Sequence, residues 1–213
     1  MKRLLTAGLV ITTITTLTAC VAAPPARDYS AFNKAAPRSI LVLPVVNKSL
    51  DVEAPSYFLS TVTTPFANRG FYIFPVNAVK SVMDLEGMAD PDLAHRADPK
   101  ILGELFGADA ILYVTINRWD AKYALITTSV TVDFGYEIKD GRTGESLWKD
   151  KQMMVYSPQQ NNSTGNPMAD LLVMAVSAAI TKAKPNYLPL TRIANGSVSL
   201  RVPEGPYIQK VMN

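Results

Sequence analysis

The stretch that decides the fold reads Val130-Thr131-Val132-Asp133-Phe134-Gly135-Tyr136-Glu137-Ile138-Lys139, followed by Asp140-Gly141-Arg142-Thr143-Gly144-Glu145. In the first part, apolar residues stand at every even position and polar residues or glycine at every odd one. That period of two predicts a β-strand with one face in the core and one face in water. The second part carries two glycines where positive φ is expected. It therefore predicts a hairpin turn into an antiparallel partner strand over Ser146–Tyr156.

Upstream of the hairpin, two apolar runs predict buried strands. Ser39–Asn47 is rich in β-branched residues and is expected to end at Pro44 or soon after, and the second run covers Ala108–Asn117. A short strand is expected at Phe71–Pro75 and an irregular polar segment at Met88–Asp98. Helices are predicted over Ala54–Asn68, Val76–Leu85 and Lys100–Phe106, the last opened by Pro99. Within the first of them, Pro65 is expected to cause a kink or a split.

Downstream of the hairpin, the sequence predicts mainly helices. They are expected at Met168–Lys182 and at about Tyr187–Asn195, after a polar loop. The tail is expected to add a short strand at Val198–Val202. Helix–strand alternation followed by a long antiparallel hairpin predicts an α/β fold, a mixed sheet of about five strands packed with helices. The polar side of strand 130–138 predicts that part of one sheet face lies in water.

The amino terminus has the order of a secretory signal peptide. Lys2 and Arg3 precede an apolar stretch of about 16 residues, shorter than the roughly 20 of a membrane-spanning helix. The stretch ends in Leu17-Thr18-Ala19-Cys20, and Cys20 is the only cysteine of the chain. This tetrapeptide resembles the lipobox of bacterial lipoproteins, in which the cysteine takes a diacylglycerol and becomes the acylated amino terminus. The alternative is an ordinary secretory cleavage beside an incidental cysteine.

The lipobox resemblance implies a membrane anchor at Cys20, because several acyl chains hold a protein essentially permanently in a bilayer. No aspartate follows the cysteine, which in such lipoproteins implies the outer membrane, facing the periplasm. We therefore divide the chain into a signal peptide (1–19), a lipidated cysteine with an Ala/Pro tether (20–38), a single α/β domain (39–195) and a tail (196–213). Tyr29 and Phe32 are the tether residues expected to dock on the domain.

Composition excludes several partners and chemistries. Loss of Lys2 and Arg3 with the signal peptide lowers the 21 basic residues by two, against 18 acidic ones, so the mature charge is about +1. A near-neutral body argues against nucleic acid as a partner. With Cys20 acylated, the domain has no thiol for a disulfide, a metal site or a nucleophile.

The sequence contains no pattern that indicates a catalytic, cofactor or metal site. His95 is the only histidine and is expected to be a solvated loop residue. The hairpin glycines lack the strand-to-helix context and the lysine of a phosphate-binding loop. The carboxylate pairs Asp84/Glu86 and Asp90/Asp92 lack the regular spacing and the closing glutamate of a calcium loop. We therefore expect no catalytic residue, no cofactor, no metal and no enzymatic activity.

The helix predicted over 168–182 is apolar nearly all round. Its polar residues Asp170, Ser177 and Thr181 share one narrow stripe. A helix of this kind is either buried in the core or covered by a partner, and both alternatives stay open. As a subunit interface in a homo-oligomer it would present Leu172, Ala175, Val176 and Ala179.

Three segments carry a family resemblance: the run from Ile40 to Ser49, the run from Gly107 to Leu112, and the hairpin from Asp140 to Trp148. Together they resemble the TolB amino-terminal-like fold, which the curli-secretion-channel lipoproteins share. Over about residues 17–207 the chain is similar to uncharacterised Gram-negative outer-membrane lipoproteins with this fold. The resemblance implies an accessory role in envelope transport or secretion, with a curli-channel-like lipoprotein as protein partner. It supplies no catalytic residue.

The sequence thus predicts a lipid-anchored periplasmic accessory protein that binds protein partners at the outer membrane and supports a secretion or transport assembly. The alternative is a periplasmic carrier for an apolar ligand or a polysaccharide. A hydrolase is the third alternative, without a visible nucleophile–base pair. An apolar pocket of several hundred Å³ would favour the carrier, and an exposed apolar surface would favour the assembly role.

Overall fold

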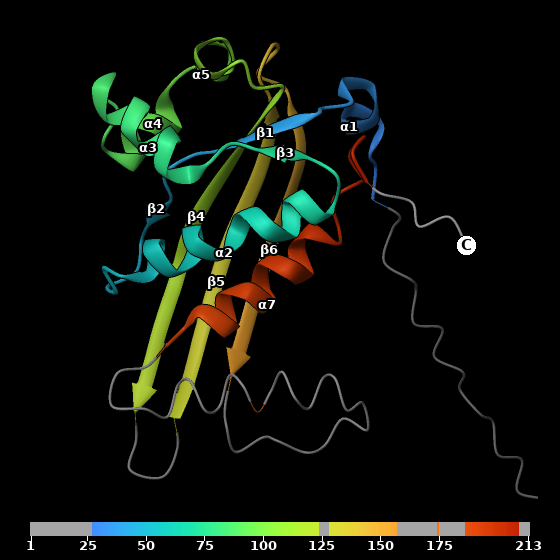
Figure 1. Cartoon of the computed structure of the whole chain (residues 1–213). Helices are drawn as coiled ribbons and strands as arrows, with labels where there is room; N and C mark the ends of the chain where they lie inside the picture. Colours follow the sequence, from blue (N-terminus) through green and yellow to red (C-terminus); the bar gives the residue numbers. More distant parts are fainter. Residues whose placement is uncertain (1–26, 124–127, 157–173, 175–185, 209–213) are drawn as a thin grey trace, which may run out of the picture.

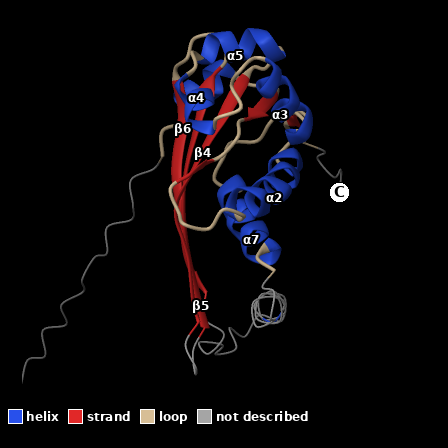
Figure 2. Cartoon of the chain, turned by 90° about the vertical axis from the view of Figure 1, so that its left-hand side faces the viewer, coloured by secondary structure: helices blue, strands red, loops and turns tan. Residues whose placement is uncertain are grey.

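A mixed β-sheet with helices packed on it forms the body of the protein. The computed structural model describes residues 27–123, 128–156, 174 and 186–208. Its six-stranded sheet has the order β3-β1-β4-β5-β6, and β2 pairs with β4 off this path. Two helices, α2 and α7, lie across one face of the sheet (Figure 1), and the sheet seen nearly edge-on in Figure 2 has both of them on the same side. The predicted α/β class, the mixed sheet and the long antiparallel hairpin are confirmed.

The strands combine a parallel half and an antiparallel half. β1 runs parallel to β3 and to β4, β2 runs parallel to β4, and β4, β5 and β6 form two successive antiparallel pairs. The run around Pro44 forms two short strands, β1 and β2, which both pair with β4. The run is interrupted at Pro44 because proline has no N–H to donate to the neighbouring strand. The strand bounds are β1 Ser39–Val42, β2 Val46–Asn47, β3 Tyr72–Ile73, β4 Ala110–Tyr123, β5 Thr128–Asp140 and β6 Ser146–Tyr156.

The helices confirm most of the predicted ranges. Those described are α1 Ser30–Ala35, α2 Ala54–Asn68, α3 Val76–Leu85, α4 Pro91–Arg96, α5 Pro99–Phe106 and α7 Leu188–Ser199. The α2 helix continues through Pro65 as one element, so the expected split does not occur.

Two local predictions were wrong. The segment expected to be irregular contains α4, where the Asp90 carboxylate accepts the backbone N–H groups of Asp92 and Leu93 as an N-cap. The strand expected at Val198–Val202 does not form, because α7 continues to Ser199 and the next three residues are a turn and a bend.

The two faces of the sheet are covered to different extents. On one face, α2 and α7 pack on the even-numbered side chains of β5, and the ring of Phe58 meets that of Phe134 edge-on at 5.2 Å between centroids. On the opposite face, a smaller core joins Leu41, Ile111 and Tyr113 to α3 and α5 at one end of the sheet. The rest of that face, over β4, β5 and β6, carries no helix among the described residues. The prediction of a partly wet sheet face therefore holds.

The expected docking of Tyr29 and Phe32 is confirmed. Phe32 in α1 is 2% exposed, and its ring lies 6.0 Å from that of Phe71 in an edge-on contact. The Tyr29 hydroxyl donates a hydrogen bond to the carbonyl of Arg201. Within the described residues, no helix combines the length and the apolar character needed to cross a bilayer.

Candidate functional site

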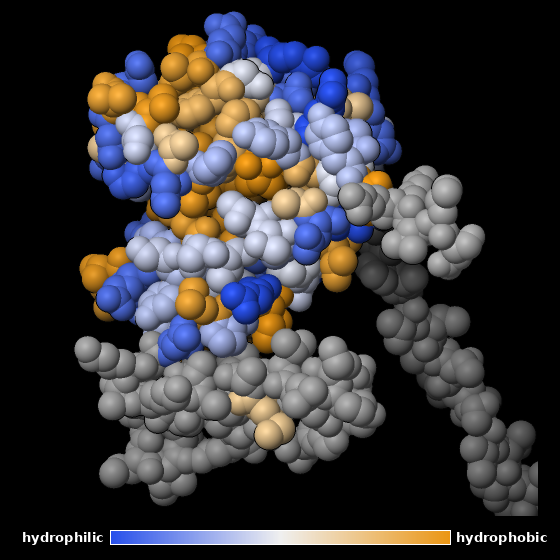
Figure 3. All heavy atoms as spheres, viewed as in Figure 1, coloured by the Kyte–Doolittle hydropathy of each residue, from blue (hydrophilic) through white to orange (hydrophobic). Residues whose placement is uncertain are grey.

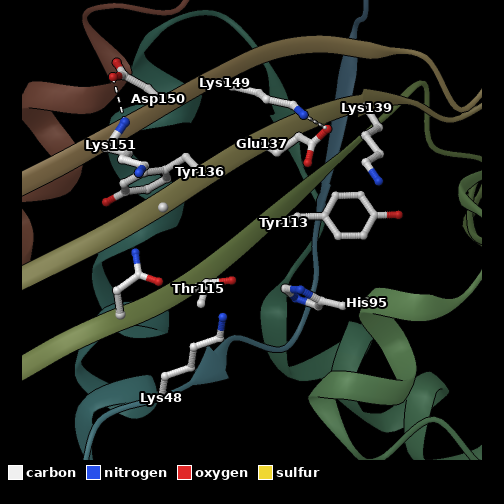
Figure 4. A pocket seen from close by; sticks show the side chains of 12 residues that line it. Lys48, His95, Tyr113, Thr115, Tyr136, Glu137, Lys139, Lys149, Asp150 and Lys151 are labelled. Atoms are coloured by element: carbon white, nitrogen blue, oxygen red, sulfur yellow. Dashed lines mark hydrogen bonds and ion pairs between the residues drawn. The ribbon is translucent and has the colours of Figure 1, made fainter.

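The open face of the sheet forms the first candidate site, a shallow cleft of about 680 Å³. Its floor is Gly135 in β5 with Thr115 and Asn117 in β4, and Lys48 follows β2 at one margin. Figure 4 shows Lys48 rising from one side, with Lys149 and Lys139 on the other. Lys149 pairs with Glu137 at 3.2 Å, and the Lys139 ammonium lies 4.7 Å from the centroid of the Tyr113 ring. This cleft, defined by these residues and Lys151, is called the lysine cleft below.

One end of the lysine cleft is closed by Tyr113 and by His95 of α4. Burial and the carboxylates of Glu137 and Asp98 raise the pKa of Tyr113 to about 12. His95 Nε2 lies 2.9 Å from the carbonyl oxygen of Pro44, and its ring meets Tyr113 edge-on. Burial lowers the pKa of His95, against smaller raising effects of that carbonyl and of Asp92. His95 is therefore neutral at pH 7 and donates from Nε2.

The prediction that His95 is a solvated loop residue was wrong. It lies in a helix, is half-buried and fixes that helix to the chain at Pro44. The polarity of its neighbours in the sequence concealed this, because α4 is short and half of its residues are exposed.

The second candidate site is an apolar groove of about 690 Å³ between α2, α3 and the ends of β1 and β2. Val42, Val45, Leu59 and Val76 contribute its apolar walls, and Asn47, Asn77, Lys80 and Asp92 its polar rim. Figure 3 shows apolar surface gathered between α2 and the region of α3 and α4 on this face. This surface is called the apolar groove below.

A loop with two exposed aliphatic side chains adjoins the apolar groove. Between β2 and α2, Leu50 is 100% exposed and Val52 is 87% exposed. The loop projects from the left of the molecule in Figure 1, where Figure 3 shows an apolar patch. We call residues 48–53 the Leu50 loop.

Side-chain hydrogen bonds hold the Leu50 loop in shape. The Asn47 side-chain oxygen accepts from the N–H and the hydroxyl of Ser49, and its amide group donates to the carbonyl of Asp51. The Asp51 carboxylate in turn accepts from the N–H of Glu53. Two apolar side chains are thus presented to solvent on a loop that side-chain hydrogen bonds hold in shape.

Most of the predicted site residues cannot be compared with the structure. The lipobox residues Leu17, Thr18, Ala19 and Cys20 lie outside the described residues, and so do the interface residues Leu172, Ala175, Val176 and Ala179. The carboxylates are described: Asp84 pairs with Lys80 and Asp90 caps α4. The described residues contain no group of three or more His, Cys, Asp or Glu side chains able to hold a metal ion.

Sequence reasoning missed both surfaces. A signal for the lysine cleft was present, since Gly135, Glu137 and Lys139 occupy the wet positions of the alternating strand. The apolar groove had no such signal, because its walls come from four separate stretches of the chain that only the fold brings together.

Comparisons with known proteins identify the class as bacterial lipoproteins. The lipoprotein NMB1124/NMB1162 of Neisseria meningitidis serogroup B is 30% identical over 167 residues, covering 78% of this chain and 75% of that protein. The crystal structure of lipoprotein GNA1162 from Neisseria meningitidis matches with a TM-score of 0.57 and 30% identity, covering 67% of this chain and 96% of that one. A weaker likeness is to the PelC dodecamer from Paraburkholderia phytofirmans, with a TM-score of 0.44 and 12% identity, covering 75% and 84% of the two chains.

The GNA1162-like lipoprotein family model matches residues 27–197. This chain belongs to that family. The match spans the docked α1 helix, the sheet and nearly all of α7, so both candidate surfaces lie within it.

Proposed function

We propose that this protein is a lipid-anchored, non-catalytic module at the periplasmic face of the outer membrane that binds a protein partner of a secretion or transport assembly. The observation that carries the proposal is the Leu50 loop, with one side chain wholly exposed and another 87% exposed beside an apolar groove. Exposed apolar surface rimmed by polar residues is typical of protein interaction sites. The resemblance to TolB-like domains favours a curli-channel-like lipoprotein as this partner.

The energetics of the Leu50 loop suit binding. Full burial of a leucine or a valine side chain stabilises a complex by about 1.5–3 kcal/mol each. Ordering a loop on binding costs part of such a gain. Because hydrogen bonds of Asn47, Ser49 and Asp51 already hold this loop in shape, that ordering cost is reduced.

The course of the chain before α1 supports a role close to the membrane. Arg27 is already held on the body, since its guanidinium pairs with Asp150 at 3.0 Å. If Cys20 is acylated, the seven Cα–Cα steps from Cys20 to Arg27 span at most about 25 Å. The point where the chain joins the body, at Arg27, would then lie within that distance of the bilayer.

The anchor itself is tested by labelling. Cells given radiolabelled palmitate should incorporate label into the full chain and not into a Cys20→Ala variant, which should leave the membrane fraction. Persistent label on that variant would refute the anchor.

The partner role is tested by photo-crosslinking in intact cells. A photoreactive amino acid at position 50 or at position 59, in the groove wall, should capture the same protein. The matched control is position 200, because Leu200 is also exposed, at 71%, but lies at the end of α7. Identical adducts from all three positions, or none from 50 and 59, would contradict the proposal.

The second candidate function is a carrier for an apolar ligand, favoured by the size and lining of the apolar groove. Small-molecule sites have volumes of about 300–1,000 Å³ with mostly apolar walls, and the groove has about 690 Å³. A carrier should copurify with an extractable lipid, and Leu59→Trp should abolish that copurification by filling the groove. If Leu59→Trp instead abolishes the crosslink from position 50 and leaves the amount of copurified lipid unchanged, the result favours the partner role.

A further inference from the structure

We infer that the lysine cleft on the open sheet face is a binding site for a multiply charged oxyanion of the phosphate class. The inference is independent of the proposed function, because the cleft and the apolar groove share no lining residue.

The strand register brings the cationic side chains to one spot. Lys151 stands opposite Gly135, and Gly135 stands opposite Thr115, so these three form one row across β6, β5 and β4. The next row on the same face is Lys149, Glu137 and Tyr113. Neighbours within a row lie about 5 Å apart and adjacent rows about 7 Å apart.

Lys48 completes the site from the opposite side of β4. It follows β2, which pairs with β4 at Thr115 and Ile116, and its backbone N–H donates to the carbonyl of Ile116. The row of Thr115, Gly135 and Lys151 therefore ends in Lys151 on one side and has Lys48 beyond Thr115 on the other. Figure 4 shows Lys48 extending toward Thr115.

The charges of the cleft do not cancel. Its lining contains four lysines and two carboxylates. Asp150 is bonded to Arg27 and Arg201, which keep its pKa low against the raising effect of its partial burial. Glu137 neutralises Lys149, and Lys139 lies on the ring of Tyr113. The Asp150 carboxylate also accepts the backbone N–H of Lys151, but among the described residues no carboxylate forms an ion pair with the ammonium group of Lys48 or Lys151.

Gly135 makes room for a ligand at the centre. A Cβ on this residue would meet the Asn117 amide nitrogen at 3.5 Å, an ordinary contact, so the neighbouring side chains do not require glycine there. Glycine inside a strand often marks a place where a ligand approaches the backbone closely. Here it leaves a depression between the lysines, with the Thr115 hydroxyl and the Asn117 amide on its floor as hydrogen-bond donors.

The ligand class follows from charge and donors. Each lysine offers a compact charge with three donors. A phosphate monoester carries about −1.5 to −2 charge at pH 7 and three acceptor oxygens. A phosphate group can therefore contact Lys48 and Lys151 at the same time and balance both charges. A single carboxylate carries one charge and would leave one of the two lysines unbalanced. A lipid headgroup and a free phosphate or phosphate ester share this chemistry.

The test uses the full chain in micelles of a neutral detergent, with amide NMR shifts as the readout. One arm adds inorganic phosphate, and the other dopes the micelles with phosphatidic acid. At least one of the two titrations should saturably shift the backbone amide of residue 135. The site variant is Lys48→Gln/Lys151→Gln, and the matched control is Lys34→Gln/Arg192→Gln, with the same loss of charge on exposed residues of α1 and α7.

The site variant should weaken the apparent affinity at least tenfold, and the control should change it less than twofold. A response to doped micelles alone identifies a lipid headgroup, and a response to phosphate in solution identifies a free ligand. No saturable shift in either arm, or equal weakening in both double variants, overturns the inference. Gly135→Leu, which fills the depression without changing charge, should also abolish the shifts while the circular dichroism spectrum stays that of the parent.

Discussion

A buried polar side chain, Asn195, connects the two helices on the covered face to the sheet below them. Its side-chain oxygen accepts the hydroxyl of Tyr136 at 2.9 Å, and its amide nitrogen donates to the hydroxyl of Thr61 at 3.0 Å. All three residues are buried. A buried polar group left without its partner costs about 1–3 kcal/mol. One amide thus forms hydrogen bonds to both α2 and β5 from α7.

We therefore expect Asn195→Ala to destabilise the fold by about 2–3 kcal/mol, because it leaves the buried Tyr136 hydroxyl without its acceptor. Urea denaturation followed by circular dichroism measures this. Arg192→Ala on the exposed side of α7 is the control, with an expected change within about 0.5 kcal/mol. In a double-mutant cycle, Tyr136→Phe should cost less in the Asn195→Ala background than alone. Strict additivity would contradict the connection.

For Tyr113, we expect that loss of the hydroxyl does not lower the stability of the fold. Its hydroxyl is buried and has no hydrogen-bond partner among the described residues. Tyr113→Phe should therefore be neutral at pH 7 or stabilising by about 1 kcal/mol.

The alkaline pH dependence of Tyr113 supplies a second readout. Its pKa is about 12 in the fold against 10.0 for the free side chain, so between these values the folded state binds more protons. Its contribution is complete below pH 10 and is lost as the pH rises toward 12, by roughly 2–3 kcal/mol. Stability measured from pH 9 to 12 should fall less steeply in Tyr113→Phe than in the parent, and parallel curves would contradict the assignment.

At the scale of elements, α5 meets the β5–β6 turn by direct backbone contact. A Cβ on Gly103 of α5 would overlap the backbone of Gly141, and a Cβ on Gly141 would overlap the carbonyl oxygen of Ala108. The hairpin glycine therefore serves a close approach as well as a turn. The two glycines set how near α5 lies to the end of the sheet.

Gly103→Ala should consequently destabilise the protein by about 2 kcal/mol or more through overpacking, although alanine is the better helix former. The matched control is Gly196→Ala in α7, where a Cβ would meet nothing within 4 Å. That substitution should stabilise by about 0.5–1 kcal/mol. Thermal denaturation of both variants measures the two changes in stability. If Gly103→Ala also stabilises the protein, helix propensity outweighs the backbone contact.

The elements that sequence reasoning predicted correctly are those with a sustained period, such as β5, α2 and α3. β4 was predicted to end at Asn117, yet it continues to Tyr123. A register shift between Ile116 and Arg118 interrupts the alternation, so the pattern stops while the strand goes on. The α4 helix was missed because a six-residue helix has too few turns for a period, although the Asp90-Pro91 pair is a start signal.

At the scale of the whole molecule, the sequence predicted a sheet with one wet face, but not the functional surfaces. The lysine cleft needs the register of β4, β5 and β6 together with the position of Lys48 after β2. The apolar groove needs the packing of α2 against α3 and the sheet ends. Both depend on contacts between distant segments, which periodicity within one segment does not contain.

The docking of α1 limits how far the body can move from its anchor. Phe32 holds α1 on the body, and Phe→Ala substitutions at buried sites cost about 3–5 kcal/mol. A six-residue helix is not stable alone, so Phe32→Ala should release the chain as far as residue 38. The reach from Cys20 would then grow from about 25 Å to about 60 Å.

Trypsin treatment of the full chain measures the release, since Lys34 lies in α1. Phe32→Ala should be cut after Lys34 at least tenfold faster than the parent, and Asn33→Ala, an exposed neighbour on the same helix, should be cut at the parental rate. In cells, the released form should lose position-50 crosslinks if the partner lies close to the membrane. Faster cleavage with unchanged crosslinks would show that the distance of the Leu50 loop from the bilayer does not matter for binding.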